Sequence, residues 1–203
     1  MYSQKFVLDT TAFTNATSPK KSKDVLQYTK KLVKIVADAR VKLGVTCYIP
    51  YPMAYNELVA CLKMRDAKEA QLIDLDTWFI KKTPNRYEVK LSSEIFYEYI
   101  GDIRERMNKG LRLAEDAVKE ASRKKDHAPL ITILRDKYKS ALREGVLDSR
   151  EDLDVLLLAK ELNAGVVTAD EGMIKWAEKM GLEIIPANRF PKILQDQLDM
   201  SEK

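Results

Sequence analysis

Cysteine and histidine are almost absent from this 203-residue sequence, which has two cysteines and one histidine. Cys47 and Cys61 are too few for a disulfide framework and are wrongly spaced for a zinc knuckle, so we interpret them as buried core thiols. The single His127 excludes chemistry that needs paired histidines, and its polar surroundings favour an exposed turn. The sequence therefore gives no support to a zinc knuckle or to a site built on two histidines.

Long hydrophobic runs are also missing. No stretch approaches roughly 18 uninterrupted apolar residues, the length that would span a membrane. The N-terminus runs directly into a strand-like segment without a basic and then apolar leader, which favours a cytoplasmic protein. Glycine and proline number only seven each among abundant Lys, Glu, Leu and Ala, and this composition predicts a mostly helical chain.

The net charge is only +4, but the charges are unevenly distributed. Residues 20–42 contain eight basic residues against two acids, and residues 104–143 contain twelve against six. Acids gather instead in the run from Asp148 to Asp154 and near the C-terminus. This separation suits a polyanion held by basic helices over an acidic centre, although a single lysine is as well explained by a solvated helix face.

Two apolar runs end on aspartate. Phe6-Val7-Leu8 leads directly into Asp9, and the run from Gly165 to Thr168 is followed closely by Asp170. Continuous apolar runs of this kind are typical of strands covered on both faces in a parallel sheet. Because functional sites of such sheets form at the carboxyl ends of the strands, we expect both aspartates at one edge.

The alternation of strand and helix signals predicts an α/β fold with a mostly parallel sheet and right-handed crossovers. The expected strands are 6–8, 45–49, 165–168 and 182–185. The expected helices are 22–43, one opened by Pro52, about 66–82, one beginning at Asp148, and 171–180, with a short fraying helix in the tail 191–203.

A different pattern fills the segment between the second and third strand. Apolar residues recur at alternating three- and four-residue steps, which predicts a long helix that packs against a partner helix. A second apolar stripe follows Pro129, so we expect an antiparallel helical hairpin inserted into the α/β core. The predicted domains are a core of residues 1–91 and 146–203 and a hairpin of residues 92–145. The first stripe comprises Ile100, Ile103, Met107, Leu111, Ala114, Val118 and Ala121.

The acids after the hairpin allow two interpretations. Asp148 and Asp152 are four residues apart, so on one helix they share a face, where two ionised carboxylates repel unless a cation lies between them. The segment from Asp148 to Glu151 also resembles a capping box, and a capping aspartate can still be a ligand. For Asp9 and Asp170 the alternative is likewise an N-cap of the next helix, but a carboxylate that ends an apolar strand needs a partner or a metal.

Carboxylate oxygens without histidine or cysteine favour Mg²⁺ or Mn²⁺ over zinc. Such a centre beside basic helices would activate water and stabilise charge on a phosphodiester, so metal-assisted hydrolysis of nucleic acid is the expected reaction class. A phosphate-binding glycine loop, a GxGxxG motif and a Ser/His/Asp set are all absent. Asp9-Thr10-Thr11 also lacks the second aspartate that an aspartyl-phosphate phosphatase needs.

Four patches of the chain carry acidic motifs. They are Val7-Leu8-Asp9-Thr10-Thr11, Glu57, the run from Asp152 to Ala159, and Val167-Thr168-Ala169-Asp170. These patches resemble the acidic motifs of PIN-domain ribonucleases. With the basic hairpin, the whole chain resembles the small protein-only ribonuclease P family found in some bacteria and archaea, whose members are also labelled RNA ligase partner proteins.

The resemblance implies a PIN-like sheet and metal-dependent removal of the 5′ leader of precursor tRNA, leaving a 5′-phosphate. It implies catalytic, metal-binding roles for Asp9, Asp148, Asp152 and Asp170, and Glu57 matches a further acid of the wider PIN group. It also implies homo-oligomers, with the hairpin serving assembly and tRNA binding. The candidate RNA-binding residues on the hairpin are Arg104, Arg106, Lys109, Arg112, Lys119, Arg123, Lys124 and Lys125.

Two alternatives remain at this stage. One is a PIN ribonuclease that acts on another RNA. The other is a non-catalytic RNA-binding or ligase-partner protein, in which the carboxylates are only helix caps and surface charge.

Overall fold

The computed structural model describes residues 4–14, 22–121, 128–143, 147 and 149–202. The chain divides into two compact units, one of Met1–Val89 with Ser149–Lys203 and the other of Lys90–Asp148. Within the described segments, no helix is both long enough and apolar enough to cross a membrane.

The first unit is an α/β core. Its elements in chain order are β1 (Lys5–Leu8), α1 (Thr11–Thr14), α2 (Ser22–Leu43), β2 (Thr46–Pro50), α3 (Met53–Lys63), α4 (Glu69–Trp78), β3 (Ile80–Lys82), α7 (Arg150–Leu162), β4 (Gly165–Thr168), α8 (Glu171–Lys179), β5 (Ile184–Pro186) and α9 (Phe190–Ser201). The second unit holds α5 (Ser93–Ala121) and α6 (Ala128–Arg143).

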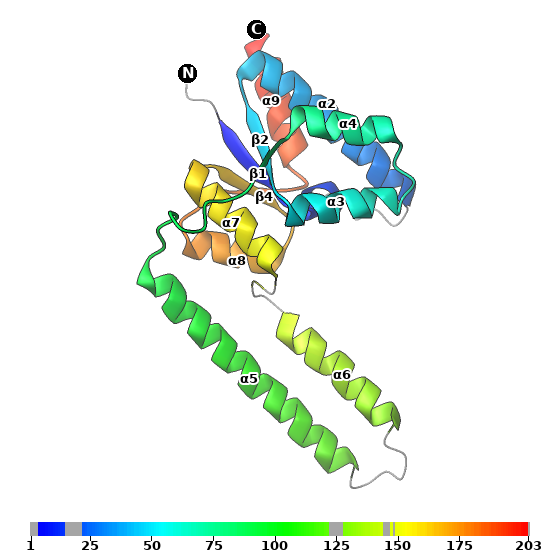
Figure 1. Cartoon of the computed structure of the whole chain (residues 1–203), viewed down its shortest axis with the longest axis vertical. Coiled ribbons are helices and arrows are strands. Elements are labelled where there is room, and N and C mark those ends of the chain that lie inside the picture. The colour runs from blue at the N-terminus through cyan, green and yellow to red at the C-terminus, as the bar shows by residue number, and fades with distance from the viewer. Residues whose placement is uncertain (1–3, 15–21, 122–127, 144–146, 148, 203) are drawn as a thin grey trace. The chain divides into compact units, whose positions relative to one another are not determined.

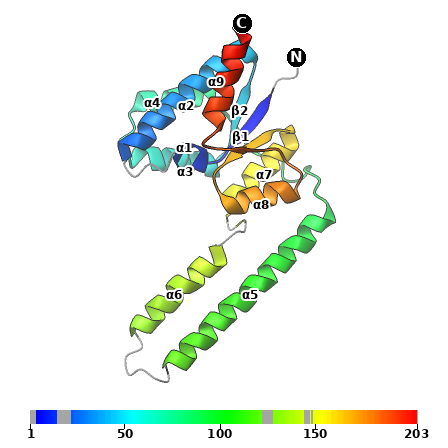
Figure 2. The same cartoon turned by 180° about the vertical axis from the view of Figure 1, so that it is seen from behind.

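The described strands form one sheet in the order β3-β2-β1-β4-β5, and every neighbouring pair is parallel. The predicted parallel α/β fold is therefore confirmed. Helices α2, α4 and α9 lie on one face of the sheet and α7 and α8 on the other, while α3 packs against β2 and α7 (Figures 1 and 2). Val7 and Leu8 on β1 and Val166 and Val167 on β4 are buried, as expected for central strands covered on both faces.

Strand β3 is absent from the sequence-based prediction, which placed a helix through it to residue 82. Helix α4 instead ends at Trp78, and Ile80 pairs with Tyr48 of β2. Three residues at a sheet edge bury little apolar surface, so their pattern does not stand out from the helix before them. The short helix α1 was also not anticipated.

The tail helix is another correction. Instead of a short fraying segment, α9 runs over Phe190–Ser201 and lies against α2. Phe190, Leu194 and Leu198 are buried in the main core, and the Phe190 ring meets Phe6 of β1 edge to face at 5.1 Å. Its i, i+4, i+8 apolar spacing anchors the C-terminal segment to the sheet.

Helices α5 and α6 pack against each other within the second unit (Figure 1). The contact face differs from the predicted one. Gly110 is buried against the ring of Tyr138, because a glycine allows the two helices to approach closely there. Ile100, Met107 and Leu111 of the predicted stripe are 60–67% exposed, so the stripe does not form the seam between α5 and α6.

Candidate functional site

Asp9 lies at the carboxyl end of the central strand β1. Its backbone N–H donates to the carbonyl of Val167 at 3.1 Å, so the pairing with β4 continues one residue beyond the strand. The residue is 3% exposed. The sheet register thus holds a buried carboxylate at the edge where β1 and β4 end.

Three threonine hydroxyls donate to the Asp9 carboxylate. Thr10 Oγ1 donates to Oδ1 at 3.2 Å, Thr168 Oγ1 donates to Oδ2 at 2.9 Å, and Thr11 Oγ1 also donates to Oδ2. In the part of the chain that the structure describes, no cationic group contacts Asp9. A buried carboxylate that has hydroxyl donors and no described cationic partner is suited to binding a metal ion.

Two of these threonines also connect Asp9 to the loop that carries Asp170. The backbone N–H of Ala169 donates to Thr11 Oγ1 at 2.9 Å, and that of Asp170 donates to Thr168 Oγ1 at 3.0 Å. Each hydroxyl therefore accepts from the loop and gives its single proton to Asp9. Sequence reasoning placed both aspartates at this edge but did not assign this role to Thr11 and Thr168.

Asp170 is the N-cap of α8. Its Oδ1 accepts the backbone N–H of Met173 at 2.8 Å, so the capping interpretation describes the bond that this side chain makes. The residue is exposed, in contrast to Asp9. A cap engages one carboxylate oxygen and leaves the other available to a ligand.

The next acids belong to the first turn of α7. The cap of this helix is Ser149 rather than Asp148, because Ser149 Oγ accepts the backbone N–H of Asp152 at 3.0 Å. Asp152 is half-buried in that first turn. Asp148 lies outside the described residues.

Glu57 on α3 is electrostatically coupled to the same edge. Partial burial raises the pKa of its carboxyl group, and the charges of Asp9 and Glu151 raise it further. Among the described residues, no three His, Cys, Asp or Glu side chains are arranged to hold a metal ion. Asp148 is not one of the described residues.

Asp154 has a separate function. It is buried on α7, and its two oxygens accept bonds from Nε of Arg86, at 2.8 Å, and from the Arg86 Nη2. Nearby, the backbone N–H of Asn85 donates to Glu161 Oε2 at 2.7 Å, and Lys82 forms an ion pair with Glu161. These contacts attach residues 82–86 to α7.

The chain is similar to known proteins over almost its whole length. The family model of the PINc domain ribonuclease matches residues 5–199. Proteins named RNA-free ribonuclease P are 47% identical in Methanococcus vannielii, 45% in Methanocaldococcus jannaschii and 46% in Archaeoglobus fulgidus. The alignments cover 98%, 100% and 97% of this chain and 98%, 96% and 92% of those proteins, respectively.

The chain belongs to the RNA-free ribonuclease P family. It carries a PINc ribonuclease domain and is an endoribonuclease, so the resemblance seen in the acidic motifs is confirmed. PIN nucleases generally use divalent metal ions, which fits the carboxylate donors at the sheet edge.

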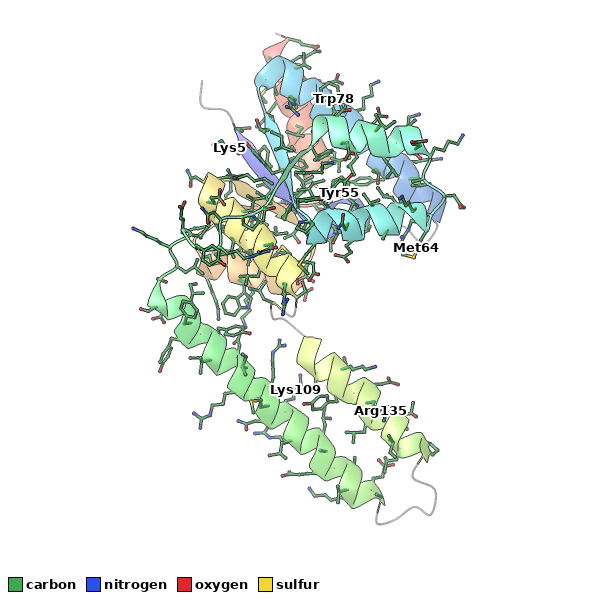
Figure 3. The ribbon with its side chains drawn as sticks, in the orientation of Figure 1. Lys5, Tyr55, Met64, Trp78, Lys109 and Arg135 are labelled. Carbon is green, nitrogen blue, oxygen red and sulfur yellow. The ribbon has the colours of Figure 1, made fainter. Side chains whose placement is uncertain are left out.

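The candidate RNA-binding residues of this ribonuclease P family member lie along α5 where they are described. Arg104, Lys109, Arg112 and Lys119 are exposed and Arg106 is half-buried. Lys109 is labelled on α5 in Figure 3. Lys119 Nζ lies 3.5 Å from Asp116 Oδ1, so an acid of the same helix partly neutralises its charge. Arg123, Lys124 and Lys125 lie outside the described residues, as does His127.

Proposed function

We propose that this protein removes the 5′ leader of precursor tRNA by metal-dependent hydrolysis, leaving a 5′-phosphate. The observation that carries the proposal is the buried Asp9 carboxylate at the sheet edge. It accepts hydrogen bonds from hydroxyl groups and contacts no cationic group among the described residues. The reaction is inferred from relatives that are named RNA-free ribonuclease P. The acids at the strand ends provide a site where it can take place. A tRNA precursor as substrate accords with a cytoplasmic protein.

We assign the metal site to Asp9, Asp148, Asp152 and Asp170, with Glu57 as a further ligand. Mg²⁺ or Mn²⁺ suits an all-carboxylate site, and such an ion supplies an activated water and stabilises charge on the leaving oxygen. The chain's own groups orient the site. Thr11 and Thr168 fix the Asp9 carboxylate, and the Asp170 loop is held by the same two hydroxyls.

We expect the two parts of the chain to have different roles. The core of residues 1–91 and 146–203 carries the chemistry, and the hairpin of residues 92–145 binds RNA. Arg104, Lys109 and Arg112 present exposed charge along α5, as contacts to RNA phosphates require. Arg106, Lys119, Arg123, Lys124 and Lys125 complete the proposed set.

The hairpin also fits assembly into homo-oligomers. Phe96, Ile100, Met107, Leu111 and Val118 of α5 are 60–70% exposed and recur at four- and seven-residue steps, so they share one side of the helix. An apolar stripe of this period is the usual contact face of a helix with another helix. A second copy of this chain would bury the stripe that α6 leaves exposed.

The test is incubation of the purified full-length protein with a precursor tRNA that carries a 5′ leader, with Mg²⁺ and in parallel with a chelator. The expected products are one leader fragment and a mature tRNA with a 5′-phosphate, formed only with the metal. Cleavage at other positions would point to a different RNA target. No cleavage of any RNA would support a binding role without catalysis.

A further inference from the structure

A groove lies between α2 and α4. Its volume is about 540 Å³, and its lining includes Lys30, Lys31 and Lys34 from α2 and Asp74 and Trp78 from α4. Figure 3 labels Trp78 on α4. A groove of this volume matches the size of common small-molecule and nucleotide sites.

The three lysines form a concentrated positive charge. Positions 30, 31 and 34 lie within one turn of each other on the same side of α2, and all three side chains are exposed. No ion pair to any of them occurs among the described residues, although Asp74 contributes one carboxylate to the same lining. With three lysines and one carboxylate in its lining, the groove offers a net positive charge to an anionic partner.

Trp78 supplies an aromatic surface beside these charges. The residue is half-buried, with part of the indole packed on the main core and part lining the groove. Arg40 Nη1 on α2 donates to the carbonyl of Trp78 at 3.2 Å and to that of Thr77 at 3.4 Å. These bonds fasten the end of α4 to α2 and fix the aromatic wall relative to the lysines.

A small cavity next to the groove contains an unpaired polar group. Thr29 is 4% exposed, and its hydroxyl has no hydrogen-bond partner. It lines a cavity of about 20 Å³ that shares Lys30, Val33 and Asp74 with the groove. This volume can hold about one water molecule, and an unpaired buried hydroxyl favours a polar occupant there.

We propose that this groove binds a single-stranded segment of the RNA substrate, with phosphates at Lys30, Lys31 and Lys34 and a base stacked on Trp78. Lysines that follow a backbone beside an aromatic ring are the general means by which proteins hold single strands. The inference rests on the proposed function for the identity of the ligand as RNA. It adds a second RNA-binding surface, on the catalytic core rather than on the hairpin.

The probe is a labelled single-stranded oligouridylate of about ten nucleotides, titrated into the full-length protein. Trp176 is 1% exposed, so quenching of tryptophan fluorescence by the RNA reports on Trp78. We expect quenching in the wild type and none in Trp78→Phe. Replacing Lys30, Lys31 and Lys34 together by Ala should weaken binding about tenfold or more and reduce the slope of log affinity against log salt by about 2, at about 0.7 per phosphate contact.

A matched control comes from the same helix. Lys42 forms an ion pair with Glu202, which neutralises its charge. The Lys42→Ala variant should therefore bind the RNA like the wild type. Lys31→Ala removes the same single charge and should lower the salt slope by about 0.7. Equal slopes for these two variants would overturn the inference, as would displacement of the RNA by an equal concentration of polyglutamate.

The same preparations are assayed for precursor-tRNA cleavage, which separates the two proposals. Cleavage without quenching of Trp78 would overturn the proposed RNA binding in the groove and leave the proposed function intact. Quenching that depends on the three lysines, without cleavage of precursor tRNA, would overturn the proposed function and support the groove.

Discussion

Thr168 donates its hydroxyl proton to the buried carboxylate of Asp9 at 2.9 Å while accepting the backbone N–H of Asp170 at 3.0 Å. One side chain on β4 therefore fixes an acid on β1 and the start of the loop that carries the next acid. Because the two aspartates are 161 residues apart in sequence, this hydroxyl is a main element that sets their relative position.

Thr168→Val keeps the shape of the side chain and removes both bonds. We expect cleavage to fall about 10- to 100-fold, the usual cost of losing a group that orients a metal ligand. The free energy of unfolding should fall by about 1–3 kcal/mol, because the Asp170 N–H and an Asp9 oxygen lose a partner. Single-turnover cleavage and denaturant unfolding measure the two effects.

Thr168→Ser is the control, since serine retains the hydroxyl. It should recover most of the activity that Thr168→Val loses. If both variants cleave at the wild-type rate, the hydroxyl does not position the site.

The ion pair of Arg86 with buried Asp154 should stabilise the core without taking part in the chemistry. Arg86→Ala leaves the Asp154 carboxylate without its partner and should cost about 1.5–3 kcal/mol of unfolding free energy. Urea unfolding of the variant measures this loss. Replacing both residues together, as Arg86→Met with Asp154→Leu, should recover much of it because no buried charge remains.

The Glu57 pKa makes a pH-dependent prediction. Its folded-state pKa is raised, so the folded state holds the proton more tightly than the unfolded chain does. This contribution to stability is complete below the ordinary pKa of a glutamate and is lost as the pH rises through the raised value. Glu57→Gln should therefore match or exceed the wild-type stability at neutral pH without divalent metal, with the advantage disappearing in acid.

Thermal unfolding across pH tests this expectation. A Glu57→Gln variant that is less stable than the wild type at neutral pH, in the presence of a chelator, would contradict the electrostatic coupling to Asp9 and Glu151. Addition of Mg²⁺ should stabilise the wild type more than the variant if Glu57 is a ligand.

The exposed stripe of α5 makes a prediction about assembly. Met107→Glu places a charge on the stripe and should shift the protein to smaller species in light scattering coupled to gel filtration. Asn108→Glu adds the same charge to the neighbouring exposed position and should leave the distribution unchanged. Identical distributions for both variants and the wild type would remove the proposed role of the stripe.

The sequence was sufficient to predict the parts of the molecule that depend on local patterns. Apolar runs ending on Asp9 and Asp170 predicted two central parallel strands and a common edge, and the structure has β1 and β4 paired there. The long helices of the hairpin followed from their period. The edge strand β3 was missed because three residues carry too little pattern to be distinguished from the end of a helix.

The remaining features depend on contacts between distant residues. The Arg86–Asp154 pair joins positions 68 apart, and the Thr168–Asp9 bond joins positions 159 apart. Period also fails to say which partner an apolar stripe meets, which is why Ile100 and Met107 were placed against α6 although they are exposed. Such relationships require the fold itself.

The most direct test of the account is the single-turnover rate of precursor-tRNA cleavage by Asp9→Asn as the Mg²⁺ concentration is raised. The substitution keeps the size of the side chain and removes the charge that the buried site offers to a metal. The account predicts a loss of about 100-fold or more, equivalent to roughly 2.7 kcal/mol of transition-state stabilisation, with the fold retained by circular dichroism. If Asp9→Asn cleaves at the wild-type rate at every Mg²⁺ concentration, the account is contradicted.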